Sequence, residues 1–326
     1  MAETDSLSLH RDALIVDTHC DTLLGLMRGR PLGERRDEGH IDLPRLREGG
    51  VGVQFFACYI EPQFKPDRGL KRVLQQIDAF YQAVEANRDQ IEVALTVADI
   101  ERIRAAGKVA AVLAIEGGEA IDGDLAALRM LHRLGIRSFG LVWNQRNLLA
   151  DGIGERHTHG GLTTLGVEAV REMNRLGMVV DVSHLNDEGF WDVIETSTSP
   201  IMASHSNSRA VCDHPRNLSD DQIRALAKNG GVMGMNFCPA FVRSEGPVTV
   251  DHLIDHIDHI VDLVGFDHVG LGSDFDGIND VPQGLEDVSR LPNLTRRLAE
   301  RGYSEENIRK ILGGNHLRVL KAVWRA

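Results

Sequence analysis

The stretch Leu14-Ile-Val-Asp-Thr-His-Cys-Asp21 decides how the fold is interpreted, because an apolar run ends there in residues that bind metals or move protons. Four later apolar runs end in the same way, at Glu116, His184, His205 and Asp274. Stretches of helical length separate the five runs. We therefore expect strands of one parallel sheet whose ends meet at a shared site, which makes the chain an enzyme candidate.

Three further runs have strand character, since they are rich in β-branched and aromatic residues and flanked by glycine; they cover 51–59, 136–143 and 231–237. Helical patterns lie between the eight runs. They cover 70–88 and 165–176 before Gly177, follow a capping box at Ser219–Gln222, and run from Ser304 to an expected end at Gly313-Gly314. This alternation predicts a (β/α)8 TIM barrel, with residues 1–326 as a single domain. A doubly wound sheet is the alternative, but no glycine-rich phosphate turn follows the first run.

The charge and composition exclude several classes of partner. A formal net charge of -12 disfavours nucleic acid and anionic membranes. No apolar stretch is long enough to span a bilayer, and the first residues do not have the pattern of a signal peptide. We therefore expect a cytoplasmic protein. The four cysteines are dispersed, which argues against a disulfide framework or a thiolate zinc site.

The polar residues at the ends of the runs suit a metal site. In a strand, residues i and i+2 point to the same side, so His19 and Asp21 are expected to converge on one ion while Cys20 faces away. Imidazole and carboxylate ligands suit zinc. Five candidate ligands are too many for one tetrahedral zinc with an open position, and they suit two ions; the five are His19, Asp21, Glu116, His184 and His205.

The same set predicts a hydrolytic mechanism. Glu116 is the expected bridge between the ions, because its strand lies between the two ligand groups in sequence. Two divalent ions would polarise a carbonyl and lower the pKa of a bridging water to roughly 7. Asp274 could then take the proton of that water and pass it to a leaving amine. A single buried His or Asp at a strand end is more often a hydrogen-bonded structural residue. Six such residues at strand ends in one chain favour a functional site instead.

Other histidines provide a contrast. His252 and His256 have the i,i+4 spacing of ligands on a helix, but apolar residues form the buried stripe of that helix. We therefore expect both histidines to be structural and to lie on its solvated face. His157 and His159 lie in a polar loop, where a lid role is left open.

Seven motifs together resemble one enzyme family. They are Asp17-Thr-His-Cys-Asp21, Ile115-Glu-Gly-Gly118, Asn174-Arg-Leu-Gly-Met-Val-Val-Asp-Val-Ser-His184, Ser204-His-Ser206, Arg216-Asn217, Gly272-Ser-Asp-Phe-Asp-Gly277 and Gly313-Gly-Asn-His-Leu-Arg318. Over nearly the whole chain, this set resembles the renal-type (membrane) dipeptidase family, peptidase family M19, and in particular its bacterial members. The resemblance implies a barrel of the metallo-dependent hydrolase type, with two zinc ions, that cleaves dipeptides, often with a C-terminal D-residue.

The resemblance also implies roles for single residues. It puts His19 and Asp21 at one zinc and His184 and His205 at the other, with Glu116 and a water or hydroxide as bridges and Asp274 as the acid/base.

Three more positions concern the substrate, a small dipeptide. Arg216 matches the arginine that holds the substrate carboxylate, and Tyr59 is a further contact candidate. Trp143 stands where animal members carry a substrate-contacting histidine, so the sequence leaves the substrate preference open. A homodimer is compatible with the sequence.

Two other functions are alternatives to a dipeptidase. Barrel amidohydrolases such as N-acyl amino acid deacylases and lactonases usually pair His-x-His on the first strand with a carboxylated lysine on the fourth. This chain has His-x-Asp, and 136–143 contains no lysine. Loss of a metal-binding residue would favour a non-catalytic binding protein or a pseudoenzyme, but none of these residues is lost. We predict a zinc-dependent dipeptidase in which a metal-bridging hydroxide attacks the peptide carbonyl.

Overall fold

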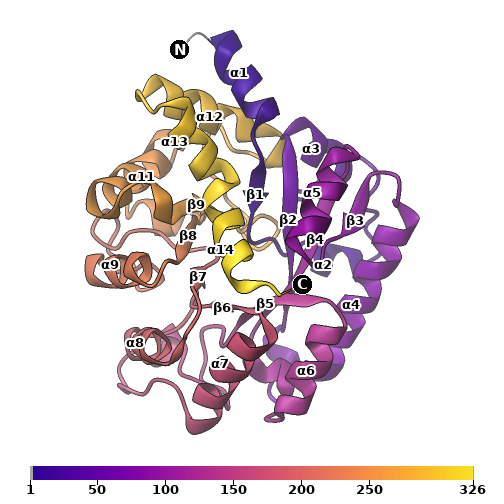
Figure 1. The fold of residues 1–326 in the computed structure, drawn as a ribbon, viewed down its shortest axis with the longest axis vertical. Helices are drawn as coiled ribbons and strands as arrows, with labels where there is room; N and C mark the ends of the chain where they lie inside the picture. Colours follow the sequence, from indigo (N-terminus) through magenta and orange to yellow (C-terminus); the bar gives the residue numbers. More distant parts are fainter. Residues whose placement is uncertain (1–2, 326) are drawn as a thin grey trace.

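In the computed structural model, which describes residues 3–325, parallel strands close into a barrel with helices packed around it (Figure 1). The barrel strands are β1 (Ile15–Asp17), β2 (Val51–Tyr59), β4 (Val109–Glu116), β5 (Ile136–Gly140), β6 (Val179–Asp181), β7 (Met202–Ala203), β8 (Val232–Met235) and β9 (Val269–Leu271). The ring closes because β1 pairs with both β2 and β9, and β2 pairs with β4. Each barrel strand falls within a predicted run, so the predicted eight-stranded barrel is confirmed.

A ninth strand, β3 (Ile91–Val93), lies outside the ring and was not predicted. It pairs with β4 at residues 109–111, before β5 begins to pair with β4 at Leu113. The first part of β4 would otherwise present an unpaired edge, and β3 covers it. Its three residues are too short for an alternating pattern to be recognised in the sequence.

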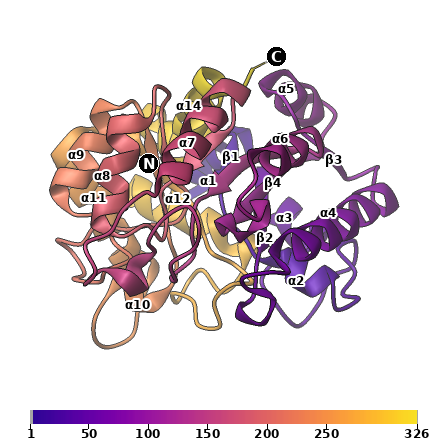
Figure 2. The same cartoon turned by 90° about the horizontal axis from the view of Figure 1, so that it is seen from below.

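Helices pack around the strands, and Figure 2 shows them in a view turned by 90°. They are α1 (Glu3–Asp12), α2 (Thr22–Leu26), α3 (Leu43–Glu48), α4 (Gly69–Ala86), α5 (Val97–Ala105), α6 (Leu125–Arg133), α7 (Thr164–Leu176), α8 (Asp187–Thr196), α9 (Asp220–Lys228), α10 (Pro239–Val242), α11 (Val250–Val264), α12 (Leu291–Glu300), α13 (Glu305–Arg309) and α14 (Asn315–Val323). Within residues 3–325, none of them combines the length and the hydropathy needed to cross a bilayer.

Local sequence signals fix several helix ends. Gly177 ends α7 with φ 74°, a conformation that glycine adopts at low cost. The capping box before α9 is present, since Ser219 Oγ accepts from the backbone N–H of Gln222 and the Gln222 side chain accepts in return. The patterns at 70–88 and 165–176 are confirmed as α4 and α7.

The expected helix end at Gly313-Gly314 is confirmed at Gly313, where the backbone leaves the helical region (φ 179°, ψ -15°). The chain passes from α13 through Lys310–Gly314 and resumes as α14 after this kink. A Cβ at Gly313 would stand 2.4 Å from the carbonyl oxygen of Leu14 and 3.0 Å from the backbone nitrogen of Val16. Glycine is therefore also needed at this kink for close packing against the first strand.

The core has an inner and an outer layer, divided by the strands. Along β4 the side chains alternate between two apolar clusters, with Val112 in one and Leu113 in the other. The smaller cluster also contains residues of α5 and α14, and the Trp324 ring lies 6.5 Å from that of Phe55. Figure 1 shows α14 across the ring of strands. We infer that α5 and α14 cover the end of the barrel where the strands begin.

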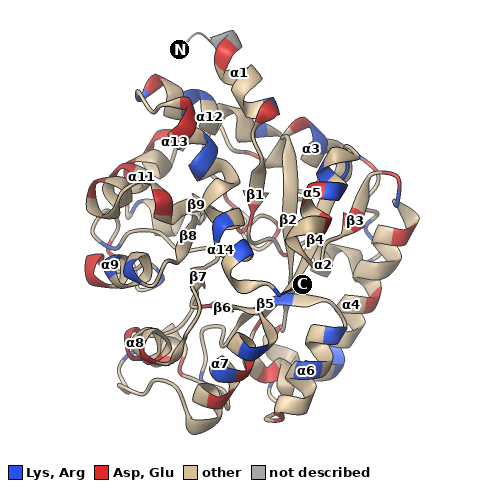
Figure 3. Cartoon of the chain, viewed as in Figure 1, with Lys and Arg blue, Asp and Glu red and all other residues tan. Residues whose placement is uncertain are grey.

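Many of the charged residues belong to the surrounding helices, where acidic and basic positions are interspersed (Figure 3). Three of the charged residues in the barrel strands, Asp17, Glu116 and Asp181, are the last residues of their strands. The carboxyl ends of the strands are therefore the polar end of the barrel, as the fold requires for a site.

Candidate active site

All six predicted metal and proton-transfer residues lie together at the carboxyl ends of the strands. Glu116 is the last residue of β4, and the others follow their strands directly; they are His19 and Asp21 after β1, His184 after β6, His205 after β7 and Asp274 after β9. The explanation from strand alternation was wrong in one respect, because β1 ends at Asp17 and the loop itself brings His19 and Asp21 together. All are buried except Asp274, whose side chain is 14% exposed.

The carboxylate of Glu116 faces two groups of ligands with different oxygens. Its Oε1 lies 2.8 Å from Nε2 of His184 and 3.4 Å from Nε2 of His205. Its Oε2 lies 3.8 Å from Nε2 of His19. This orientation is the one that a carboxylate bridging two ions requires.

Several buried polar atoms of the site have no ordinary partner. Nε2 of His19 and Oδ1 of Asp21 make no hydrogen bond with any residue in the described range 3–325. The Nε2 atoms of His184 and His205 face each other at 3.0 Å. Buried polar atoms are costly unless they are paired. Two divalent cations among these nitrogen and oxygen atoms would satisfy them, so the donor set fits a metal such as zinc.

The histidines of the two ligand groups differ in their pKa values, with His184 and His205 in one group and His19 in the other. Burial lowers the pKa of His184 and of His205 well below the ordinary value, so both rings are neutral. Burial also lowers the pKa of His19, but Glu116, Asp21 and Asp274 outweigh it and raise that pKa to about 10. Burial raises the pKa of Asp21 to about 6 and that of Asp274 to about 7, with Glu116 adding repulsion.

A second layer of side chains orients the two neutral histidines. Nδ1 of His184 lies 2.8 Å from Oδ1 of Asn144, and Nδ1 of His205 lies 2.7 Å from Oγ of Ser204. Ser204 in turn donates to Oδ2 of Asp181 at 2.5 Å. A ring that donates from Nδ1 keeps its Nε2 lone pair for a metal. These three partners were not identified from the sequence.

Asp17 plays a corresponding part on the other side of the site. It accepts from Nε2 of Gln54 at 3.0 Å and from the backbone and hydroxyl of Ser273 at 2.8 and 2.7 Å. It thus links the end of β1 to the middle of β2 and to the loop that follows β9. A signal was present, because Asp17 and Asp181 each precede a candidate ligand by two or three residues.

Two of the site residues have unusual backbone conformations. His184 has φ 69° and Asp274 has φ 65°, in the left-handed region that non-glycine residues rarely adopt. Such strain is concentrated at functional sites, where the surrounding structure holds it.

A cavity of about 580 Å³ opens above the ligands, and Arg216, Trp143 and Tyr59 all line it. Arg216 is buried and donates to the carbonyl oxygen of His205 at 3.1 Å and to Ser206 Oγ at 3.4 Å. Its Nε has no hydrogen-bond partner within residues 3–325. Its guanidinium also lies 5.6 Å from the ring centroid of Phe241. A buried guanidinium with a spare donor suits an anionic ligand.

The aromatic wall of the cavity is formed by Tyr59 and Trp143, whose rings pack edge to face at 5.3 Å. Nζ of Lys65 lies 5.2 Å from the Trp143 ring and 5.9 Å from the Tyr59 ring, and it also pairs with Glu119 at 3.3 Å. Burial raises the pKa of Tyr59, so its hydroxyl is neutral. Lys65 was not identified from the sequence, since nothing in its neighbourhood there links it to strand ends.

The contacts of three histidines outside the site indicate structural roles. His256 was expected on a solvated face and is fully buried instead: Nδ1 accepts from the backbone N–H of Ser208, and Nε2 donates to the carbonyl of Val242. His252 accepts from the backbone N–H of Thr249 at the start of α11. His159 pairs with Glu188 at the surface.

Comparison with known proteins identifies close relatives. Residues 4–326 match the family model described as membrane dipeptidase (peptidase family M19). The chain is 38% identical over 295 residues to dipeptidase tcpJ of Claviceps purpurea, covering 87% of this chain and 69% of that protein.

Two solved structures share the fold over almost their whole length. A metallopeptidase from Rhodobacter sphaeroides, liganded with a phosphinate mimic of the dipeptide L-Ala-D-Ala, has a TM-score of 0.91 and 34% identity, covering 96% of this chain and 100% of that one. The probable dipeptidase PvdM from Pseudomonas aeruginosa has a TM-score of 0.91 and 26% identity, covering 99% and 98%. Because the relatives include fungal and bacterial proteins, they do not restrict this chain to the bacterial members.

Proposed function

The chain belongs to the membrane dipeptidase family, peptidase family M19, and on that premise we propose that it hydrolyses dipeptides with two bound zinc ions. The proposed ligands are His19, Asp21, Glu116, His184 and His205. The observation that carries the proposal is the orientation of Glu116, whose two oxygens face different histidine groups. When bound, the ions supply a water acidic enough to be a nucleophile at neutral pH and positive charge that stabilises the oxyanion.

Asp274 is the proposed proton carrier. Its Oδ2 accepts from Nδ2 of Asn236 at 2.9 Å, which fixes the carboxylate, while Oδ1 faces His19 at 3.9 Å. Burial raises the pKa of Asp274 to about 7, so near neutral pH it can both accept and release a proton. It accepts the proton of the attacking water and gives it to the departing amine.

Arg216 is the proposed anchor for the free carboxylate of the substrate. A guanidinium binds a carboxylate through paired N–H donors, and the spare Nε of Arg216 is available for this. Anchoring the C-terminus one residue from the scissile bond would limit substrates to dipeptides. Tyr59 and Trp143 would form the wall against which the side chains of the substrate pack.

We include dipeptides with a C-terminal D-residue among the substrates. The bacterial relative binds a mimic of L-Ala-D-Ala, and this chain has a TM-score of 0.91 to it. The small dipeptide is the only partner that the proposal requires.

The test combines metal analysis with activity for Glu116→Ala. The wild-type protein should hold two zinc ions per chain, and the variant at most one. The variant should lose more than about 100-fold in kcat/KM for L-Ala-D-Ala, because loss of even an outer partner of a ligand costs 10–100-fold. Glu85→Ala, at an exposed position on α4, is the control that should retain both zinc and activity. Full hydrolysis by Glu116→Ala would refute the proposal.

A further inference from the structure

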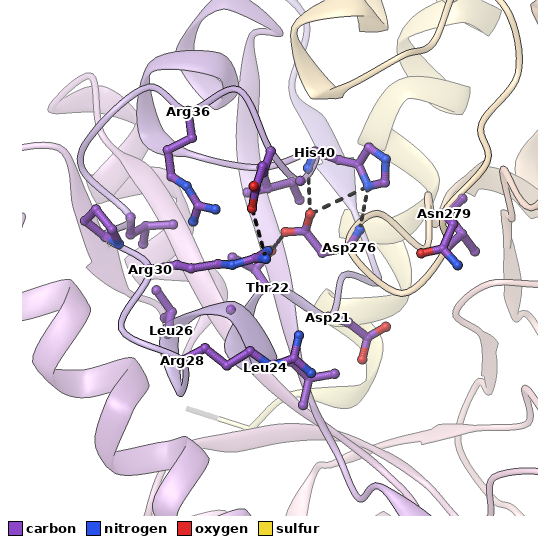
Figure 4. Close-up of a pocket in the computed structure, with 17 residues that line it drawn as sticks. Asp21, Thr22, Leu24, Leu26, Arg28, Arg30, Arg36, His40, Asp276 and Asn279 are labelled. Carbon is purple, nitrogen blue, oxygen red and sulfur yellow. Dashed lines mark hydrogen bonds and ion pairs between the residues drawn. The ribbon is translucent and has the colours of Figure 1, made fainter.

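A second cavity, of about 360 Å³, lies beside the active-site cavity, between the loop that follows α2 and the loop that follows β9 (Figure 4). Four residues line both cavities: Asp21, Leu24, Asp276 and Ile278. The cavities therefore share a wall, and one of the proposed zinc ligands belongs to it. A substrate bound at the ligands has this second cavity next to it.

Three arginines line the second cavity, and their guanidinium groups are directed into it (Figure 4). Arg30 pairs at 3.2 Å with Glu38, whose side chain is 76% exposed. The guanidinium groups of Arg28 and Arg36 have no hydrogen-bond or ion-pair partner anywhere in the described part of the chain. Arg28 is exposed and Arg36 is half-buried, so both guanidinium groups are accessible to a ligand in the cavity.

The carboxylates of the wall have other partners. Asp276 accepts from Oγ1 of Thr22 at 2.7 Å and from the backbone N–H of His40 at 2.6 Å, and its own N–H donates to that histidine ring at 2.9 Å. Asp21 faces His19 in the proposed metal group. Neither carboxylate of the shared wall pairs with Arg28 or Arg36, and a planar guanidinium group can bind a carboxylate bidentately.

The position of the cavity indicates which part of a substrate would reach it. Arg216 lies in the loop after β7, whereas the shared wall comes from the segment after β1, which includes α2, and from the loop after β9. A dipeptide with its C-terminal carboxylate at Arg216 and its peptide carbonyl near Glu116 directs its N-terminal residue toward Asp21. We propose that the second cavity binds the carboxylate side chain of an N-terminal Asp or Glu; this inference rests on the proposed function.

The test compares L-Glu-D-Ala with its neutral isostere L-Gln-D-Ala, and the corresponding L-Ala peptides, on the zinc-loaded protein. We expect kcat/KM to favour the Glu peptide by about tenfold or more, as one charged hydrogen-bonded pair provides. Arg28→Gln combined with Arg36→Gln should bring the ratio of the two kcat/KM values close to one. Equal rates for Glu and Gln peptides with the wild-type protein would overturn the inference while leaving the dipeptidase proposal intact.

A binding measurement separates the two proposals if no dipeptide is hydrolysed. Calorimetry with zinc-loaded Asp274→Asn protein measures the affinity of both peptides without turnover. Tighter binding of the Glu peptide, lost in the double arginine variant, supports the cavity assignment; equal affinity refutes it. Arg35→Gln is the matched control, since Arg35 is in the same loop but pairs with Glu48 and lies outside the cavity lining. It should keep the preference for Glu, and loss of the preference there would also contradict the assignment.

Discussion

Glu116 shows how far single residues can be interpreted from sequence. The order of strands predicts it between the two ligand groups, and in the structure its two oxygens face His184 and His19 respectively. The partners Asn144 and Ser204 were missed, because they depend on loop conformations that no periodicity encodes. The prediction that His256 lies on a solvated face was wrong for a similar reason, since α10 and the loop after β7 cover this residue.

Zinc binding should depend strongly on pH, because His19 and Asp21 must lose their protons to bind the metal. In the metal-free protein the pKa of His19 is about 10, so this ring is protonated at pH 7 and must lose its proton to bind zinc. The zinc affinity should therefore rise about tenfold per pH unit between pH 7 and 9. Below a pKa of about 6 for Asp21, a second proton must leave and the affinity should fall more steeply.

Calorimetric titration of chelated protein with zinc, in two buffers of different ionisation enthalpy, measures the protons released. We expect about one proton from His19 at pH 8. Proton uptake on zinc binding, or an affinity that is constant from pH 6 to 8, would contradict the assignment.

At the scale of elements, apolar runs located all eight barrel strands, because a strand buried on both sides has few polar residues. The three-residue β3 was missed, since it is too short to show a pattern. The predicted helix end at Gly313-Gly314 is confirmed at Gly313, where the helical backbone is interrupted. The close approach of Gly313 to the first strand was not predicted, because only the packing against β1 reveals it.

The two glycines of this pair should therefore differ in their response to substitution. Gly313→Ala should lower the free energy of unfolding by about 1–3 kcal/mol, because the new Cβ would overlap the backbone of Leu14 and Val16. Gly314→Ala should change it by less than about 1 kcal/mol, because its φ is -56° and the nearest atom, the carbonyl oxygen of Arg309, is 3.2 Å away. Urea unfolding of both variants measures this, and similar effects would argue against close packing at Gly313.

At the scale of the whole molecule, alternation of strands and helices was sufficient to predict the ring, because parallel strands joined by helices have few ways to pack. The cover formed by α5 and α14 was not predicted. It depends on which apolar faces meet, and Trp324 gives no sign in the sequence that it belongs with Phe55. The single-domain organisation stays a prediction.

Removal of metal should destabilise the molecule as a whole, because the proposed ligands join β1, β4, β6 and β7. Free zinc at about 1,000 times its Kd should add about 4 kcal/mol. That corresponds to a rise in Tm of roughly 5–10 °C for a chain of this size. Differential scanning calorimetry of chelated and zinc-restored protein measures both the shift and the number of transitions. An unchanged Tm would argue against the shared metal centre, and two separate transitions would argue against a single domain.

Closure of the ring between β1 and β9 has a consequence for biosynthesis. Asp17 pairs with Leu271, so the first strand leaves the ribosome long before its final neighbour is made. At about 5–20 residues per second, the wait lasts roughly 10–50 s. During that time β1 has an open edge, and the ligands at His19 and Asp21 exist without those at His184 and His205. The nascent chain must therefore be kept from aggregating, and from capturing metal at a half-built site, until translation is nearly complete.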